Sequence, residues 1–367
     1  MNAAVAALAT AVRLGATSTP PARTLVAGPA LLGDRVVWGE LRGQTSVLVA
    51  AGDRARFWQS DASWLAGPLA GSPSTISFAT SSTPCSGANT ACPVETTIFA
   101  GRRDSGFVPI TRPLRCVSAT AGRTIAVSAS LVATVTPSCE SATSTVTVHE
   151  GRRELFRRDG VDCCQVAIAG QTLAWSSGGT VSVFDLATRR LRYRIAPPAG
   201  EPITAFDVQA DGKLAMLVGR QPDGHSTVAW RSATEPTLHR LSLSAVLPAR
   251  QPSLRLTGDR LVLETAPPAG ATDSPRGAML VVSDLAGHQR VLARFFNRLE
   301  QVGGFDAASR VVTWASRSVT RTRLDCPPPG QQRPCLLRKT GVLTIWHARL
   351  QGGRAHPVAS WSFTDAP

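Results

Sequence analysis

Eight cysteines are the residues of this 367-residue chain whose types and spacing most directly suggest chemistry. Two pairs are close in sequence, in "TPCSGANTACPVE" and "LDCPPPGQQRPCLL", and each pair lies in a loop that contains proline together with glycine, asparagine or glutamine. Loops of this length close readily through a disulfide, which requires the two Cα atoms to lie close together. We therefore predict the disulfides Cys85–Cys92 and Cys326–Cys335.

The other four cysteines, Cys116, Cys139, Cys163 and Cys164, are expected to pair among themselves. Cys139 would bond Cys163 or Cys164, and Cys116 would take the remaining one, a choice that two adjacent cysteines leave open. Zinc is the alternative for cysteine-rich loops, but neither local pair has the short spacing of a zinc knuckle and no histidine lies beside them. The sequence thus favours structural disulfides, predicts no metal and no other cofactor, and points to an oxidising compartment.

The elements that must position these cysteines are short strands. The segment "QVAIAGQTLAWSSGGTVSVFDLATRRLRYRI", residues 165–195, alternates polar and apolar residues in four runs separated by turns. Alternation with a period of two residues, broken by Gly-Gly and similar turn signals, is typical of strands and not of helices. The segment is predicted to be a four-stranded antiparallel meander, with strands A to D in chain order.

This unit recurs along the chain. When the first apolar residue of strand B is aligned, seven copies spaced 40 to 50 residues apart span roughly residues 23–363. The aligned residues are Val36, Ile76, Ile125, Leu173, Leu214, Leu261 and Val311. The residues two positions later are Trp38, Phe78, Val127, Trp175, Met216, Leu263 and Thr313. All of these except the threonine are apolar, as a buried strand face requires.

A four-stranded repeat of this length is the sequence signature of a β-propeller, because a ring of blades covers every sheet face and leaves only short outer edges. "DVQADGKLAMLVG" resembles the Asp-Gly-Lys turn of TolB-type propellers, with Ala210 in the place of proline, and "SVFDLATRRL" resembles their hairpin between strands C and D. The chain thus resembles the WD-repeat and TolB-type superfamily, without the Gly-His and Trp-Asp signatures of strict WD repeats. The resemblance implies an all-β fold, a single seven-bladed β-propeller of four-stranded antiparallel blades, and no particular activity.

The limits of the ring leave alternatives open. Six and eight blades are the rival counts, since the second unit is the least regular. "RTLVAG", residues 23–28, either closes the ring as an outer strand or leads into the first blade. We expect residues 23–367 to form one propeller domain. Residues 1–22 hold a short apolar run and are predicted to be a leader, either the remnant of an export signal or a disordered segment.

The formal net charge of +14 admits two interpretations. It suits a protein that binds nucleic acid or another polyanion, and it also suits a solvated basic rim. The arginines are spread through the predicted turns between strands C and D, and aromatic residues do not interleave with them as a stacking platform requires. The basic rim is therefore favoured, and nucleic acid is not expected as a partner.

The sequence contains few signals of catalytic chemistry. It contains no G-x-S-x-G, H-E-x-x-H or P-loop motif, and its six histidines occupy unrelated positions of the repeat. Phe206-Asp207 and Phe305-Asp306 recur on strand A, from which both carboxylates can face the central channel. Hydrogen bonds to neighbouring backbone are the expected role of these aspartates, ahead of paired acid–base catalysis.

These observations support three hypotheses about function. The first is a secreted or envelope-associated, non-enzymatic propeller, a monomer without a transmembrane span, that binds a protein or cell-envelope polymer. The second is an enzyme of lyase or hydrolase type with residues gathered around the channel, and the third is a polyanion-binding module. In a propeller the B–C loops and the starts of strands A share one face. All eight cysteines are predicted to lie there, so the first hypothesis assigns this face to the partner. Cys116, Cys163 and Cys164 are placed at the starts of strands A, and the other five cysteines in B–C loops.

Overall fold

The computed structural model describes residues 23–364 with internal gaps. The gaps are 53–55, 83–93, 103, 117–123, 139–142, 163–164, 198–200, 220–225, 247–253, 266–277, 296–300 and 327–334. The predicted leader, residues 1–22, lies outside the described residues. The described part is built from 29 β-strands and contains no helix long and apolar enough to cross a membrane.

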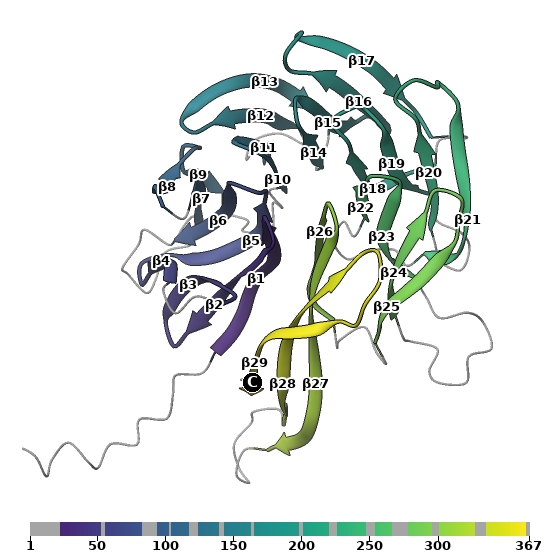
Figure 1. Cartoon of the computed structure of the whole chain (residues 1–367). Helices are drawn as coiled ribbons and strands as arrows, with labels where there is room; N and C mark the ends of the chain where they lie inside the picture. The colour runs from purple at the N-terminus through teal and green to yellow at the C-terminus, as the bar shows by residue number, and fades with distance from the viewer. Residues whose placement is uncertain are drawn as a thin grey trace, which may run out of the picture.

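The strands form seven antiparallel blades around a common centre, with strand A innermost and strand D at the rim (Figure 1). The A strands are β1 (Arg23–Leu32), β5 (Trp64–Gly71), β10 (Thr124–Ser128), β14 (Val166–Ala169), β18 (Ile203–Val208), β22 (Leu254–Thr257) and β26 (Gln301–Ala308). The B strands are β2 (Arg35–Arg42), β6 (Ile76–Ser82), β11 (Leu131–Pro137), β15 (Thr172–Ser177), β19 (Leu214–Val218), β23 (Arg260–Thr265) and β27 (Val311–Asp325). The prediction of an all-β, seven-bladed propeller is confirmed.

The outer strands complete each blade. The C strands are β3 (Thr45–Ala50), β7 (Val94–Arg102), β12 (Ser144–Glu150), β16 (Thr180–Asp185), β20 (Ser226–Arg231), β24 (Ala278–Asp284) and β28 (Leu336–Arg349). The D strands are β4 (Arg56–Ser60), β8 (Gly106–Pro109) with β9 (Leu114–Cys116), β13 (Arg153–Val161), β17 (Arg190–Ile195), β21 (Leu238–Val246), β25 (Gln289–Phe295) and β29 (His356–Thr364). We call the face with the B–C connections the loop face, and the face with the A–B and C–D turns the turn face.

The fourth blade shows why the alternating pattern builds a ring. Leu173 and Trp175 on β15 pack in a cluster with the third blade, whereas Ala174 of the same strand packs in a cluster with the fifth. Alternate residues therefore point to opposite faces, and each face is buried against a neighbouring blade. The apolar residues predicted two positions into strand B are buried in the core at five of the blades: Trp38, Phe78, Trp175, Met216 and Leu263.

A belt of hydrogen bonds near the A–B turns joins every blade to the next. The seven bonds run from Gly33 N to Ser72 O, from Ser72 Oγ to Ala129 O, from Gly170 N to Ser128 Oγ, from Thr172 Oγ1 to Ala210 O, from Leu256 N to Asp207 Oδ2, from Thr257 Oγ1 to Ser309 O, and from Leu31 N to Asp306 Oδ2. Side chains supply a partner at six of these junctions. The belt fixes the inner strands relative to one another while the apolar clusters fill the space between blades.

The ring closes without exchange of a strand between its first and last blades. β1 is the inner strand of the first blade, so the segment "RTLVAG" leads into the ring and does not add an outer strand to the seventh blade. An apolar cluster seals the seam instead, with Trp38 of the first blade stacked on Trp361 of the seventh at a ring separation of 6.3 Å. Closure therefore depends on side-chain packing and on the belt.

A buried carboxylate reinforces this seam. Glu40 accepts hydrogen bonds from Arg23, from Arg42 at 2.7 Å and from the indole N–H of Trp38 at 2.6 Å. Burial acts to raise the pKa of Glu40, but these donors outweigh it and hold the pKa below its usual value. The guanidinium of Arg23 also lies over the ring of Trp361, 4.8 Å from its centre, so the charged group is tied to the seventh blade.

The alignment of the third unit is wrong in one respect. Ile125 lies on β10, the inner strand, and Leu131 is the first apolar residue of strand B. The turn between these strands contains Ala129 with a φ of 50°, a left-handed conformation that usually favours glycine. This turn contains no glycine. The sequence pattern therefore takes Gly122, which precedes strand A, as the mark of the A–B turn.

Candidate functional site on the loop face

The prediction of a Cys326–Cys335 disulfide is confirmed. It closes the B–C connection of the seventh blade, which is on the loop face, as expected. Cys85, Cys92, Cys139, Cys163 and Cys164 lie outside the described residues, so their predicted pairings remain predictions.

Cys116 occupies a different strand from the one predicted. It ends β9, which pairs with β7 of the second blade through Val94 and Cys116, whereas the sequence pattern places it at the start of strand A of the third blade. The outer strand of the second blade is split into β8 and β9, an irregularity that the repeat pattern does not reveal. Val94 begins strand C, so the backbone of Cys116 still lies at the loop face, as predicted.

The disulfide closes an unusually long hairpin. β27 has 15 residues and β28 has 14, whereas the other B and C strands have five to nine. β29 pairs with β28 no farther than Thr340, so the two strands beyond that point pair with each other alone among the described strands. We call this distal part, Arg321–Cys326 and Cys335–Thr340, the hairpin arm. It projects from the ring in Figure 1.

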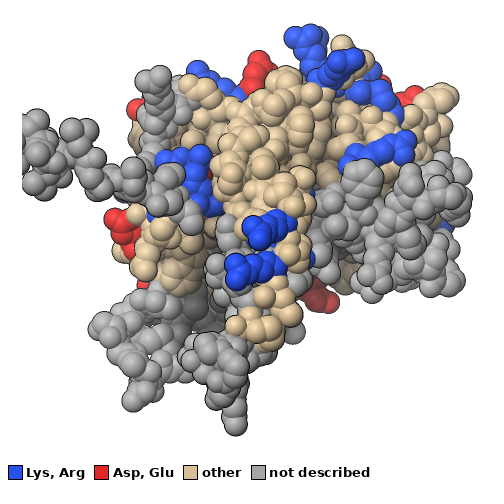
Figure 2. All heavy atoms as spheres, turned by 90° about the horizontal axis from the view of Figure 1, so that it is seen from below, with Lys and Arg blue, Asp and Glu red and all other residues tan. Residues whose placement is uncertain are grey.

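The hairpin arm presents basic and apolar side chains to solvent. Arg321, Thr322, Arg323 and Leu324 are all exposed, and Leu324 shows 58% of its surface. The backbone of Arg323 on β27 pairs with that of residue 338 on β28, within the part of the arm that no third described strand covers. Figure 2 views the molecule from the side to which the arm projects, and basic side chains (blue) clearly outnumber acidic ones (red) there.

A covalent closure suits an arm of this kind. An isolated two-stranded ribbon is only marginally stable in water. A disulfide across its end removes loop-closure entropy from the unfolded chain, an effect of about 2–3 kcal/mol for a short loop. The sequence signal that points to the arm is the Arg-x-Arg spacing of Arg321 and Arg323 beside Cys326, which the repeat pattern alone does not single out.

The central channel carries a charged cluster on three inner strands. Asp306 accepts hydrogen bonds from the backbone N–H of Leu31 at 2.9 Å and from Nε of Arg255 at 3.0 Å, and Asp207 accepts one from the N–H of Leu256 at 2.8 Å. Burial raises the pKa of Asp207 above its usual value, although Arg255 and the backbone donors oppose this shift. Each aspartate thus accepts one backbone N–H from a neighbouring blade and one from the next residue of its own strand, so the predicted backbone-bonding role is confirmed.

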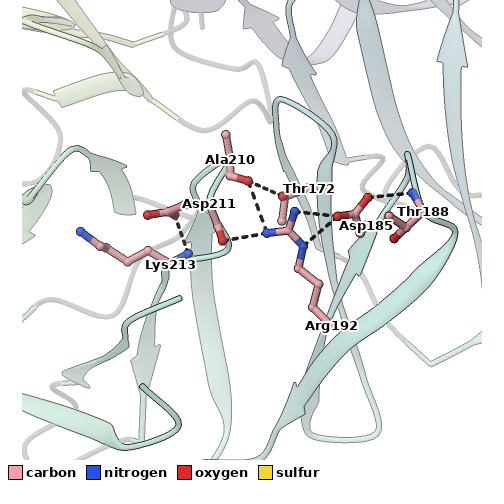
Figure 3. A network of polar contacts seen from close by, with 7 residues as sticks. All are labelled: Thr172, Asp185, Thr188, Arg192, Ala210, Asp211 and Lys213. Atoms are coloured by element: carbon pink, nitrogen blue, oxygen red, sulfur yellow. Dashed lines mark hydrogen bonds and ion pairs between the residues drawn. The ribbon is translucent and has the colours of Figure 1, made fainter. Parts of the chain in front are cut away.

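Arginines on the turn face take part in contacts between blades. In Figure 3, Arg192 of the fourth blade forms an ion pair with Asp185 at 2.7 Å and donates to the carbonyl of Asp211 in the fifth blade, also at 2.7 Å. The backbone N–H of Thr188, followed by Arg192, lowers the pKa of Asp185. Exposed arginines also stand at C–D turns of three blades, as the predicted basic rim requires: Arg102, Arg152, Arg153, Arg189 and Arg190.

Two histidines on either side of the C–D turn of the seventh blade meet at the turn face. His347 and His356 pair across β28 and β29, and their Nδ1 and Nε2 atoms are 3.3 Å apart. Burial, followed by the charge of His356, lowers the pKa of His347.

His239 stacks on Trp230 and His288 bonds Asp284, away from this pair. Within the described ranges, no three His, Cys, Asp or Glu residues converge as metal ligands.

Comparison with solved structures supports the fold alone. The β-propeller domain of the trilobed protease from Pyrococcus furiosus is 9% identical, with 81% of this chain and 98% of that chain covered and a TM-score of 0.46. A structure of prolyl endopeptidases is 14% identical with a TM-score of 0.52, and the match covers 96% of this chain but only 59% of that one. The WD40 domain of SCAP from fission yeast is 12% identical, with coverages of 95% and 75% and a TM-score of 0.36. No protein-family model and no curated protein matches the sequence.

Proposed function

We propose that this protein is a non-enzymatic, extracytoplasmic propeller that binds a protein partner with an acidic surface through its hairpin arm. The observation that carries the proposal is the disulfide-closed arm with exposed Arg321, Arg323 and Leu324. The strand pairing and the disulfide hold the two strands of the arm together before a partner arrives, which lowers the entropy lost on binding.

The chemistry of the arm favours a protein over a simple polyanion. Arginine is over-represented among the residues that contribute most to protein interfaces, where it combines an apolar stem with a planar, multiply donating head. Leu324 and the half-exposed Val319 and Val342 add apolar surface beside these arginines. A site for a polyanion would need charge alone, whereas this combination suits a partner with carboxylates around an apolar patch.

The disulfide also supports the proposed compartment. Disulfides persist where the surroundings are oxidising and are rare in the cytosol. Cys326 and Cys335 are both exposed, so glutathione would reach the bond in a reducing compartment. An extracytoplasmic location, secreted or at the cell envelope, keeps the arm closed.

The channel cluster gives the enzymatic alternative little support. Asp207 and Asp306 are engaged with backbone donors of the next blades, and Arg255 is paired with Asp306. A general base must be within hydrogen-bonding reach of a substrate proton, and these carboxylates already serve the closure of the ring.

The test compares the full-length protein with the variant Arg321→Glu/Arg323→Glu in co-purification from the secreted and envelope proteins of the cells that make it. The matched control, Arg189→Glu/Arg190→Glu, makes the same charge change on the turn face. We expect one acidic protein to be recovered with the wild type and the control, and about tenfold less of it with the arm variant. Equal recovery with the arm variant would contradict the proposal, and recovery of an acidic polymer would reassign the class of partner.

A further inference from the structure

A second feature of the loop face lies between the third and fourth blades, away from the hairpin arm. A cavity of about 250 Å³ opens there, with two arginines and three hydroxyl side chains in its wall. Its lining consists of Arg158, Gly160, Val161, Trp175, Ser177, Thr180, Ser182 and Arg194.

The strand register explains why these groups face the same space. Trp175 pairs with Ser182 and Ser182 with Arg194 across β15, β16 and β17, so the three side chains lie on one face of the fourth blade. On the third blade, Arg158 pairs with Val146, a core residue of the interface between the two blades. Arg158 therefore stands on the side of β13 that faces the fourth blade.

The cavity exists because the interface changes character towards the loop face. Nearer the turn face, Phe156 of the third blade fills the space against Trp175 and Phe184, with ring separations of 5.7 and 4.9 Å. Towards the B–C turn, the equivalent residues of the fourth blade are small and polar, namely Ser177, Thr180 and Ser182. Small side chains leave room where aromatic ones would close the interface.

The two arginines of this cavity lack acidic partners among the described residues. Arg194 donates from Nε to Ser182 Oγ at 3.2 Å, and neither Arg158 nor Arg194 forms an ion pair with a described residue. The neighbouring Arg157 behaves differently, because it is paired with Asp159 at 3.0 Å. Two cations that share one cavity without a counter-charge repel each other unless an anion lies between them.

We propose that this cavity binds a tetrahedral oxyanion, the phosphate or sulfate group of a small ester. Guanidinium groups match the oxygens of such anions through paired N–H donors. The hydroxyl groups of Ser177 and Ser182 add further donors, whereas the hydroxyl of Thr180 donates to the carbonyl of Ser177. Drug-sized ligands occupy pockets of about 300–1,000 Å³, so a cavity of about 250 Å³ admits the anion and a small polar group attached to it.

The test is calorimetric titration of the full-length protein with inorganic phosphate. We expect one saturable site per chain with a Kd of about 1 mM or tighter, weakened about tenfold or more by Arg158→Gln and likewise by Arg194→Gln. Arg157→Gln is the matched control, since it removes the same charge from the adjacent position of β13 while its partner Asp159 lies outside the cavity wall. Both arginines are exposed, so the variants are expected to fold, which thermal unfolding checks.

Competing ligands identify the chemistry of the anion. Sulfate and glycerol phosphate are expected to compete with phosphate, and acetate is expected to compete at least about tenfold less well. No saturable binding, equal weakening by Arg157→Gln, or acetate competing as well as sulfate would each overturn the proposal. The cavity uses no residue of the hairpin arm, so neither failure of this test nor its success bears on the partner proposed for the arm.

Discussion

Asp306 on β26, in the last blade, accepts a hydrogen bond at 2.9 Å from the backbone N–H of Leu31 on β1, in the first blade. The two residues are 275 positions apart, and the bond completes the belt that runs around the inner strands. Because no strand is exchanged across this seam, the contact has a larger role here than in a ring closed by a shared sheet.

Replacement of this carboxylate is expected to weaken the whole fold. Asp306→Ala leaves the N–H of Leu31 and the guanidinium of Arg255 without their acceptor, which should lower the free energy of unfolding by about 3 kcal/mol. Asp306→Asn keeps one acceptor oxygen and should lose less. Urea unfolding monitored by tryptophan fluorescence measures both variants. A loss below about 1 kcal/mol for the alanine variant would show that the seam does not depend on this bond.

The buried carboxyl group of Asp207 should make the stability of the fold depend on pH. Burial raises the pKa of Asp207 in the folded protein above the usual 3.8, so the folded state binds a proton more readily than the unfolded state. The stability that this group contributes is therefore greatest below about pH 4 and declines as the pH rises through the raised value. Asp207→Asn keeps an acceptor for Leu256 and carries no charge, so it should gain stability relative to the wild type as the pH rises from 4 to 7. Urea unfolding at both pH values tests this, and a relative loss by the variant would contradict it.

Replacement of Trp175 tests how far the stability of the fold depends on packing between blades. Trp175 is 7% exposed and contacts Phe156 and Phe184, so Trp175→Ala should lower the free energy of unfolding by about 3–5 kcal/mol. Trp64, which is 40% exposed, provides the matched control, and Trp64→Ala should cost about 1 kcal/mol or less. Chemical unfolding of the two variants compares them directly. Similar losses would mean that the interface does not depend on this ring.

Peptide mapping under non-reducing conditions tests the predicted pairing of the cysteines. Protein from an oxidising host should yield the Cys326–Cys335 peptide and also the predicted Cys85–Cys92 peptide, because both pairs close short loops of the same kind. Cys139 should be found joined to Cys163 or Cys164, and Cys116 to the remaining one of these two. Free thiols at Cys326 and Cys335 would remove both the closure of the hairpin arm and the main argument for an oxidising compartment.

The sequence predicts the architecture well because period-two alternation and turn residues repeat seven times. It fails in the third unit, where Ala129 adopts a conformation that usually needs glycine, and at Cys116, where the outer strand is broken in two. Both are local departures from the repeat, and an alignment of repeats averages such departures away.

The sites are harder to predict because they depend on which strands become neighbours. The loop of Cys326 and Cys335 is visible in the sequence, but the length of the hairpin arm follows from register beyond the last pair of β29. Arg158 and Arg194 lie 36 positions apart and share a cavity only because adjacent blades face each other. The pair of His347 and His356 likewise depends on a bulge in β28 and β29 that sequence spacing does not reveal.

Photo-crosslinking tests the role of the hairpin arm most directly. A photoreactive residue at position 324, on the arm, is compared in the cells that make the protein with one at position 191, which is 47% exposed on the fourth blade. We expect a specific adduct with one acidic protein from position 324, little from position 191, and loss of the adduct in the Arg321→Glu/Arg323→Glu background. An adduct from position 191 alone, or one from position 324 that survives the charge reversal, would show that the hairpin arm is not the binding surface.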